Sequence, residues 1–194
     1  MTKPIVKISR QDDRIFQDRR RFEHWFVDNQ VYFVTARCRE QFPAFAKEAA
    51  KAVFWDRFDH YTQAHGFTPW VTSLLDNHYH TIGYLQLGEN LPKMMHRIPG
   101  SVAKLVNDQL PRRRLQFWGD ARGREYFDGC IRDEKQARLA YRYTLTQGVR
   151  HGIANRWEDY PHTHVQVELE RAIARSRELN AFLQGVPYKR YCPF

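Results

Sequence analysis

Two β-prone runs lie next to each other in the sequence, separated only by Asp76 and Asn77. The runs are FTPWVTSLL at 67–75 and HYHTIGYL at 78–85, both rich in β-branched and aromatic residues. A short connection of turn-forming residues between two such runs is typical of a β-hairpin. The hairpin commits this part of the chain to an antiparallel sheet, because a two-residue turn cannot join parallel strands.

Hydrophobic periodicity predicts further elements on both sides of the hairpin. In chain order they are a strand at 31–38, a helix between Pro43 and Gly66, the hairpin, a helix from Leu91 to Val106, at least one strand within 114–131, and a helix capped by Asp133 with Gly148 just past its end. The order β-α-β-β-α-β-α matches a ferredoxin-like split βαβ sandwich. We therefore predict an α+β fold, with helices on one face of an antiparallel sheet.

The two ends of the chain have a different character from the middle. Residues 1–28 are rich in both charges and lack sustained periodicity, and we expect them to form a basic N-terminal arm. The stretch WEDYPHTH at 157–164 is predicted to be a loop, and 167–183 an extra C-terminal helix within a helical extension at 162–194. The region between, 29–161, is expected to be one compact domain.

The charge balance favours a polyanionic partner. The chain carries 31 basic and 22 acidic residues, a formal net charge of +9. Residues 93–125 hold +5 of that excess, with aromatic residues interleaved, a pattern typical of surfaces that contact phosphates and stack on bases. The basic positions in and near this stretch are Lys93, Arg97, Lys104, Arg112, Arg113, Arg114, Arg122, Arg124 and, further on, Arg150, and Trp118 is the candidate stacking residue. A basic but merely solvated surface is the alternative.

Three widely spaced cysteines, Cys38, Cys130 and Cys192, fit neither a disulfide framework nor a cysteine-rich zinc module. The sequence also shows no run of about 18 apolar residues of the kind that spans a membrane. We expect a cytoplasmic protein without a membrane partner.

His78 and His80 stand two residues apart in the second hairpin strand. Residues i and i+2 of a strand project from the same face, so both imidazoles point the same way and form a candidate metal-binding pair. A structural alternative, in which Tyr79 alone packs inward, is equally compatible with the local sequence. A second His-x-His match, His162 and His164, falls in the predicted loop, and we interpret it as surface.

Tyr143 and Gln147 lie four residues apart in the third predicted helix, and therefore on one helical face, whereas Tyr141 points away. If that helix packs beside the histidine strand, two imidazoles and an amide oxygen can hold a divalent cation with a phenol alongside. The alternative is that Tyr143 is a core aromatic residue and Gln147 an ordinary helix-end residue.

Three of these motifs, in this order, resemble the single-tyrosine HUH transposases, and among them the REP-associated tyrosine transposases of bacteria. They are NHYH at 77–80, which resembles the family's metal motif, YTLTQ at 143–147, which resembles its catalytic Y-x-x-x-[N/Q] motif, and VRHG at 149–152. The resemblance covers most of 30–161, so 29–161 is the expected HUH domain. The chain departs from the usual pattern at 75–76, where Leu-Asp replaces Met-Pro, and at 147–148, where Gln-Gly replaces Asn-Pro.

The resemblance implies cleavage and rejoining of single-stranded, hairpin-containing DNA. It makes Tyr143 the nucleophile that forms a 5′-phosphotyrosine, and His78, His80 and Gln147 the ligands of Mg²⁺ or Mn²⁺. It leaves open whether the protein is a monomer or a homodimer with exchanged helices. A non-catalytic protein that binds single-stranded or hairpin nucleic acid is the main alternative, and a metal-dependent hydrolase without a covalent step is a third.

Overall fold

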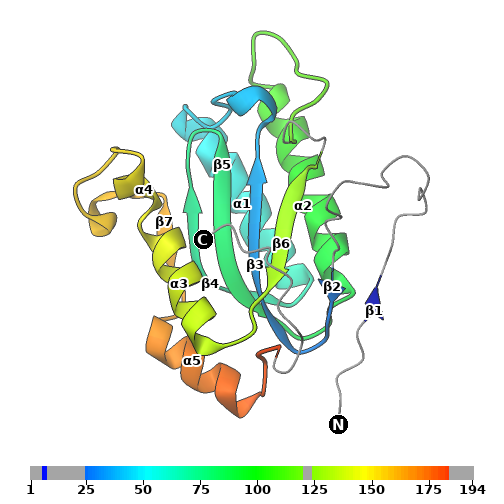
Figure 1. Cartoon of the computed structure of the whole chain (residues 1–194). Helices are drawn as coiled ribbons and strands as arrows, with labels where there is room; N and C mark the ends of the chain where they lie inside the picture. Colours follow the sequence, from blue (N-terminus) through cyan, green and yellow to red (C-terminus); the bar gives the residue numbers. More distant parts are fainter. Residues whose placement is uncertain (1–5, 8–24, 120–123, 184–194) are drawn as a thin grey trace, which may run out of the picture.

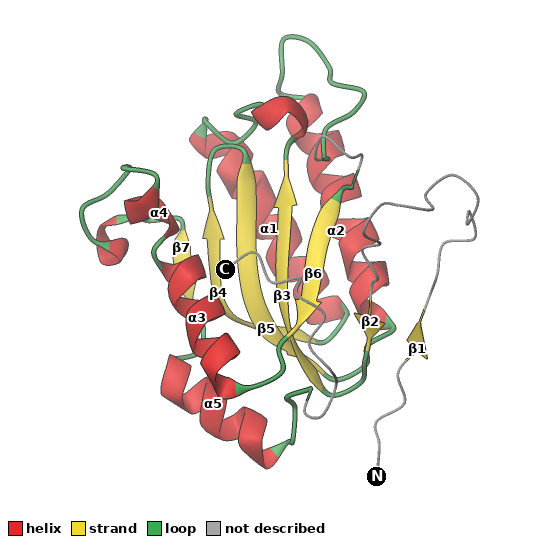
Figure 2. Cartoon of the chain, in the orientation of Figure 1, coloured by secondary structure: helices red, strands yellow, loops and turns green. Residues whose placement is uncertain are grey.

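The computed structural model describes residues 6–7, 25–119 and 124–183 of the chain. Its elements in chain order are β1 (Val6–Lys7), β2 (Trp25–Phe26), β3 (Gln30–Arg37), η1 (Arg39–Gln41), α1 (Glu48–Ala64), β4 (Phe67–Leu74), β5 (His78–Leu85), α2 (Asn90–Asn107), β6 (Tyr126–Cys130), α3 (Glu134–Leu145), α4 (Gln147–Arg150), η2 (Trp157–Asp159), β7 (Thr163–Val165) and α5 (Leu169–Glu178), where η marks a short 3₁₀ helix. Figure 1 traces this order and Figure 2 distinguishes the helices from the strands. None of the helices in these described ranges is long and apolar enough to cross a membrane.

The main sheet has five strands in the order β6-β3-β5-β4-β7, and every neighbouring pair is antiparallel. The β4–β5 pair is the predicted hairpin, and the turn between them contains Asp76 and Asn77. Strand β5 lies between β3 and β4, which is the arrangement of a split βαβ unit. The predicted α+β class with an antiparallel sheet is confirmed. A separate two-stranded ribbon pairs β1 with β2.

Helices cover both faces of the main sheet, each over its own hydrophobic cluster. Helices α1 and α2 pack on one face, with Tyr32, Leu74 and Tyr79 pointing toward them. Helices α3 and α5 pack on the opposite face, over Phe33 and Ile82. In Figure 1 these two pairs of helices lie behind and in front of the sheet. The sequence predicts helices on one face of the sheet, and α1 and α2 cover that face. The layer formed by α3 and α5 on the opposite face was not predicted. Strand β3 alternates residues between the two clusters, and a strand buried on both faces lacks the polar alternation that would reveal a second helical layer.

Several segments differ in detail from their predicted form. The 157–164 stretch is not simply a loop, because it contains η2 and leads into β7, which pairs with the edge of β4. The third predicted helix is broken at Thr146 into α3 and the four-residue α4. The C-terminal helix is shorter than predicted, at Leu169–Glu178. Most of the predicted N-terminal arm, including the Arg19–Arg21 run, lies outside the described residues.

Candidate functional site

The imidazoles of His78 and His80 lie on the α3 side of the sheet, with ring centroids 5.0 Å apart. Each ring is held at Nδ1 by an oxygen atom. Thr35 Oγ1, on the neighbouring strand β3, lies 2.6 Å from Nδ1 of His80, and the Asn77 Oδ1 atom lies 2.6 Å from Nδ1 of His78. When Nδ1 donates to such an oxygen, Nε2 carries no proton and can bind a metal ion, as in metal-binding histidines.

Burial keeps both imidazoles neutral. Burial, followed by the charges of His151 and Arg37, lowers the pKa of His78 from 6.5 to about 4, against the opposing effect of a hydrogen bond with the Gln147 side chain. His80 is 4% exposed, and burial, followed by the repulsion that its protonated form would meet from His78 and Arg37, holds its pKa well below the usual range. Neutral imidazole is the form that binds a metal ion, so this pair stays competent at mildly acidic pH.

Helix α3 carries Tyr143 toward the histidine pair. The helix begins at Asp133, whose side chain caps it by accepting a hydrogen bond from the Gln136 backbone N–H at 2.8 Å. Its buried face, which includes Ala137 and Ala140, packs on the sheet. One turn beyond Ala140, the Tyr143 ring lies edge-on to His80, with centroids 5.1 Å apart.

Gln147 opens α4 and reaches back to the same place. Its side-chain Nε2 donates to the backbone carbonyl of Tyr143 at 2.8 Å, and its side chain also hydrogen-bonds His78. Gln147 is 1% exposed. The structure thus brings together the four residues that the sequence singled out, and all four belong to one chain.

Arg150 in α4 and His151, just past the end of α4, flank this group of four residues. The Arg150 guanidinium lies over the Tyr143 ring, 4.9 Å from its centroid, in a cation–π contact. His151, just past the end of α4, has its ring 5.2 Å from that of His78. The sequence analysis assigned His151 no role, although its spacing of four from Gln147 places it on the same helical face. Thr35 was also missed, because its contact with His80 depends on strand pairing across 45 residues.

The donor set of this group fits a divalent cation. It offers two neutral imidazoles and an amide oxygen beside them, ligand types that suit Mn²⁺ and other transition metals and tolerate Mg²⁺ only with additional oxygen ligands. Within the described ranges, no cluster of three or more His, Cys, Asp or Glu side chains is arranged to hold a metal ion. A cation at this position would therefore rely on the Gln147 amide and on ligands from outside the chain.

Most of the predicted DNA-binding residues lie away from this group. Lys93, Arg97 and Lys104 project from the exposed side of α2, which covers the other face of the sheet. Arg112 and Arg113 are exposed in the segment between α2 and β6, Arg124 is half-buried, and Arg122 lies outside the described residues. Of the predicted basic set in the described ranges, Arg150 is the one in contact with Tyr143.

Two of the predicted DNA-binding residues have structural partners within the chain. Trp118 is buried in the core under α2, and its indole N–H donates to the Pro99 carbonyl at 2.9 Å, so the prediction of an exposed stacking face was wrong. Arg114 pairs with Glu40 and lies over the Phe42 ring, which ties its loop to the end of β3. Aromatic residues between charges look alike in sequence whether they stack on bases or fill a core.

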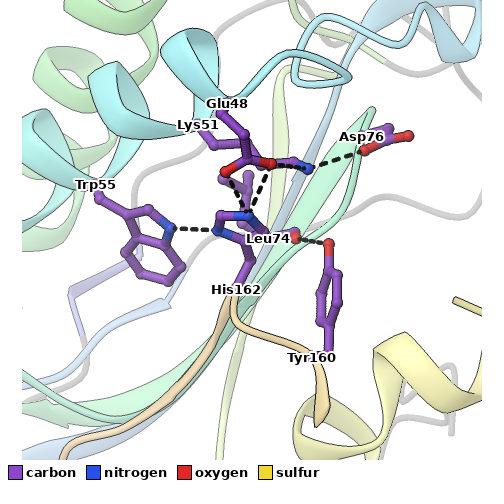
Figure 3. A network of polar contacts seen from close by, with 7 residues as sticks. All are labelled: Glu48, Lys51, Trp55, Leu74, Asp76, Tyr160 and His162. Atoms are coloured by element: carbon purple, nitrogen blue, oxygen red, sulfur yellow. Dashed lines mark hydrogen bonds and ion pairs between the residues drawn. The ribbon is translucent and has the colours of Figure 1, made fainter. Parts of the chain in front are cut away.

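The second His-x-His match is built into the fold. His162 bonds Glu48 on α1 with its Nε2, 3.0 Å from the carboxylate, and accepts from the Trp55 indole N–H at 3.4 Å (Figure 3). His164 stacks on the same Trp55, with centroids 3.7 Å apart. The prediction of a surface loop was wrong here, because β7 pairs with the edge of the sheet.

Comparison with known proteins identifies structural relatives. The sequence matches no protein-family model, and no curated protein is similar enough to count as a match. Among solved structures, a REP-associated tyrosine transposase bound to a REP hairpin matches with a TM-score of 0.60 and 17% identity, covering 76% of this chain and 81% of that one. A candidate transposase from Deinococcus radiodurans R1 has a TM-score of 0.43 and 11% identity, covering 58% of this chain and 87% of that one. The first similarity shows that the two proteins share a fold.

Proposed function

We propose that this chain is a tyrosine transposase or nuclease that cleaves and rejoins single-stranded DNA beside a hairpin. The observation that carries the proposal is the contact between Tyr143 and His80, 5.1 Å between ring centroids, in a group that also holds His78 and Gln147. Each residue has an ordinary structural explanation alone, but the four come from strand β5 and from the helices α3 and α4, which lie more than 60 residues further along the chain. The shared fold with a hairpin-bound transposase supports the same conclusion.

The covalent step uses the Tyr143 hydroxyl as nucleophile. Its oxygen attacks the phosphorus of a phosphodiester, the new oxygen–phosphorus bond forms, and the bond from phosphorus to the 3′ oxygen breaks. The phenol proton passes to water, and the departing 3′ oxygen takes up a proton to become a free 3′-OH. The 5′-phosphotyrosine retains a phosphodiester linkage, so a 3′-OH of another strand can reverse the step without ATP.

A neutral phenol is a weak nucleophile, so the step needs alignment and positive charge near the phosphate. His78, His80 and Gln147 would hold a Mg²⁺ or Mn²⁺ ion, which would supply Lewis acidity toward the phosphate. The neutral imidazoles and the amide add no negative charge of their own to the cation. Thr35 and Asn77 keep the two rings oriented through their hydrogen bonds at Nδ1.

Arg150 is a second source of positive charge for the same phosphate. Its guanidinium lies over the Tyr143 ring, on a side chain that is otherwise exposed, and can bind phosphate oxygens in bidentate fashion. Because the contact places this charge beside the nucleophile, Arg150 binds the scissile phosphate, whereas the exposed Arg112 and Arg113 contact phosphates further along the DNA. These phosphate contacts make binding strongly salt-dependent.

The test is to incubate the protein with a labelled single-stranded hairpin oligonucleotide and Mg²⁺ or Mn²⁺, and to resolve the products on a denaturing gel. We expect a covalent protein–DNA adduct that is abolished in Tyr143→Phe and retained in Tyr141→Phe. Tyr141 is a matched control, since its hydroxyl donates to the Val167 carbonyl and serves packing. Cleavage without an adduct would favour a hydrolase, and binding without cleavage would favour a non-catalytic hairpin-binding protein.

A further inference from the structure

The segment between α4 and β7 contains a buried tyrosine, Tyr160, which contacts residues next to both halves of the candidate site. The hydroxyl of Tyr160 donates to the backbone carbonyl of Leu74 at 2.6 Å (Figure 3). Leu74 ends β4, and the turn that follows it leads directly into His78. Burial raises the pKa of the Tyr160 phenol, so the hydroxyl remains a donor across the physiological range.

The other side of the Tyr160 ring packs against Gly148. A Cβ atom built on Gly148 would lie 2.7 Å from Cγ of Tyr160 and 2.8 Å from two more of its atoms. Gly148 directly follows Gln147, so the ring rests on the backbone that presents the amide. No side chain larger than hydrogen fits at Gly148 while Tyr160 keeps this place.

Helix α4 needs such an outside support. It has only four residues, and it is separated from α3 by the break at Thr146. A single helical turn is not stable by itself, because nucleation of a helix costs more than one turn of hydrogen bonds returns. The direction of the Gln147 side chain therefore depends on what packs against α4.

The 160–165 segment is itself firmly anchored to the sheet and to α1. The Leu74 N–H donates to the His162 carbonyl at 2.9 Å, and the hydroxyls of Ser73 and Thr163 lie 2.8 Å apart. His162 is bonded to Glu48, which also bonds the buried Lys51 at 3.0 Å. Figure 3 shows Lys51 reaching on to Asp76 in the turn before His78, at 3.6 Å.

We propose that Tyr160 is a positioning residue that fixes the Tyr143–Gln147 helices against the His78–His80 strand, with Gly148 as its contact surface. This inference rests on the proposed function for its consequence in catalysis. The placement itself is a property of the protein without DNA, and it can be measured in the absence of any activity.

The experiment compares Tyr160→Phe and Gly148→Ala with two matched controls. Tyr160→Phe keeps the aromatic ring and removes the hydrogen bond to the Leu74 carbonyl. Gly148→Ala keeps the Tyr160 hydroxyl but displaces the Tyr160 ring. Tyr141→Phe removes a hydrogen bond of the same kind, which the Tyr141 hydroxyl on α3 donates to the Val167 backbone carbonyl. Gly100→Ala places the same methyl group on α2, where nothing lies within 4 Å of it.

The first readout is the NMR signal of the His80 ring protons, because the Tyr143 ring lies edge-on to them. The second is the affinity for Mn²⁺ alone, measured by electron paramagnetic resonance. We expect the His80 signal to shift in Tyr160→Phe and Gly148→Ala, and Mn²⁺ affinity to fall about tenfold or more, as for other residues that orient ligands. Both controls should match the wild type, and thermal unfolding verifies that all four variants fold.

The third readout is the single-turnover rate of adduct formation at saturating hairpin DNA. We expect it to drop by about 10-fold to 100-fold in the two test variants, with hairpin affinity unchanged, because misplacement of reacting groups slows chemistry more than binding. Unchanged His80 signals and Mn²⁺ affinity in a folded Tyr160→Phe would overturn the positioning role. If the wild type forms no adduct but the first two readouts behave as expected, the proposed function fails and the positioning role stands.

Discussion

At the scale of single residues, the candidate site depends on how two imidazoles are oriented. The oxygen that holds His80 comes from a neighbouring strand, while the one that holds His78 comes from the adjacent residue, Asn77. Both contacts are made at Nδ1, so Nε2 is the other ring nitrogen at which a ligand could bind. The contact between Thr35 and His80 joins residues 45 positions apart, whereas Asn77 and His78 are neighbours in the sequence. Substitution of Thr35 therefore tests the orientation of His80 without changing the His78 turn.

Replacing Thr35 with valine removes the hydroxyl and keeps the shape of the side chain. We expect Mn²⁺ affinity, measured by calorimetry, to fall about 10-fold to 100-fold, because the partners of ligating histidines tune affinity to that extent. Thr81→Val is a control, since Thr81 pairs with Thr72 rather than with either histidine. Equal Mn²⁺ affinities in the Thr35 and Thr81 variants would rule out an orienting role for Thr35.

The neutral histidine pair also predicts how stability depends on pH. In the folded protein the pKa of His78 is lowered from 6.5 to about 4, so the unfolded chain binds more protons between these two values. The contribution of His78 to stability is therefore fully present above about pH 6.5 and is lost as the pH falls toward 4, by about 3.5 kcal/mol at about 1.4 kcal/mol per pKa unit. Urea unfolding in the presence of a chelator should show this loss, and His78→Asn should reduce it, leaving the part that comes from His80. A wild-type slope in that variant would contradict the assignment.

The sequence allowed the direction of both histidines to be predicted but not what surrounds them. Spacing in a strand placed His78 and His80 on one face, and the structure has them there. Thr35 and the burial of Trp118 could not be predicted, because each depends on a strand pairing or bridge formed between distant segments. Local periodicity carries no information on such partners.

At the scale of elements, the site depends on the helix pair α3 and α4. The N-terminal cap at Asp133 and the apolar face of α3 were predicted from local sequence signals, and the Asp133 cap is confirmed. The break at Thr146 was not predicted, since a spacing of four between Tyr143 and Gln147 fits one continuous helix equally well. The role of 160–165 was also missed, because a tyrosine in a loop-like sequence gives no sign that it packs on Gly148.

The cap on α3 should contribute measurably to stability. Asp133→Ala leaves the Gln136 N–H without its acceptor, and we expect the free energy of unfolding in urea to fall by about 1 kcal/mol. Asp133→Asn retains a side-chain oxygen and should lose much less. If the two substitutions were equally costly, the charge of Asp133, and not its bond to Gln136, would account for the stabilisation.

At the scale of the whole molecule, the fold brings two distant parts of one chain into contact. The ferredoxin-like order of strands could be predicted because each element has its own periodic signal. The second helical layer, α3 and α5 on the face opposite α1 and α2, is what carries Tyr143 to His80. That packing is a tertiary property, and no local pattern specifies it.

A site assembled within one chain cannot be restored by mixing defective chains. We expect His80→Ala and Tyr143→Phe to form no adduct separately, and a mixture of the two to form none either, because each chain lacks one component of its own site. The control is the wild-type protein, diluted to the concentration of active sites that the mixture would contain if the two variants complemented each other. Adduct recovered in the mixture would mean that the Tyr143 helix serves a partner's histidine pair.

We propose Tyr143 as the nucleophile of a site built with His78 and His80. The most direct measurement is mass spectrometry of the protein after reaction with hairpin DNA and Mn²⁺, followed by nuclease and protease digestion. We predict a nucleotide-linked peptide from α3 with the modification on Tyr143, absent when His78 and His80 are both replaced by alanine. A modification on Tyr141 or any other residue, or an adduct that persists without the two histidines, would contradict the account.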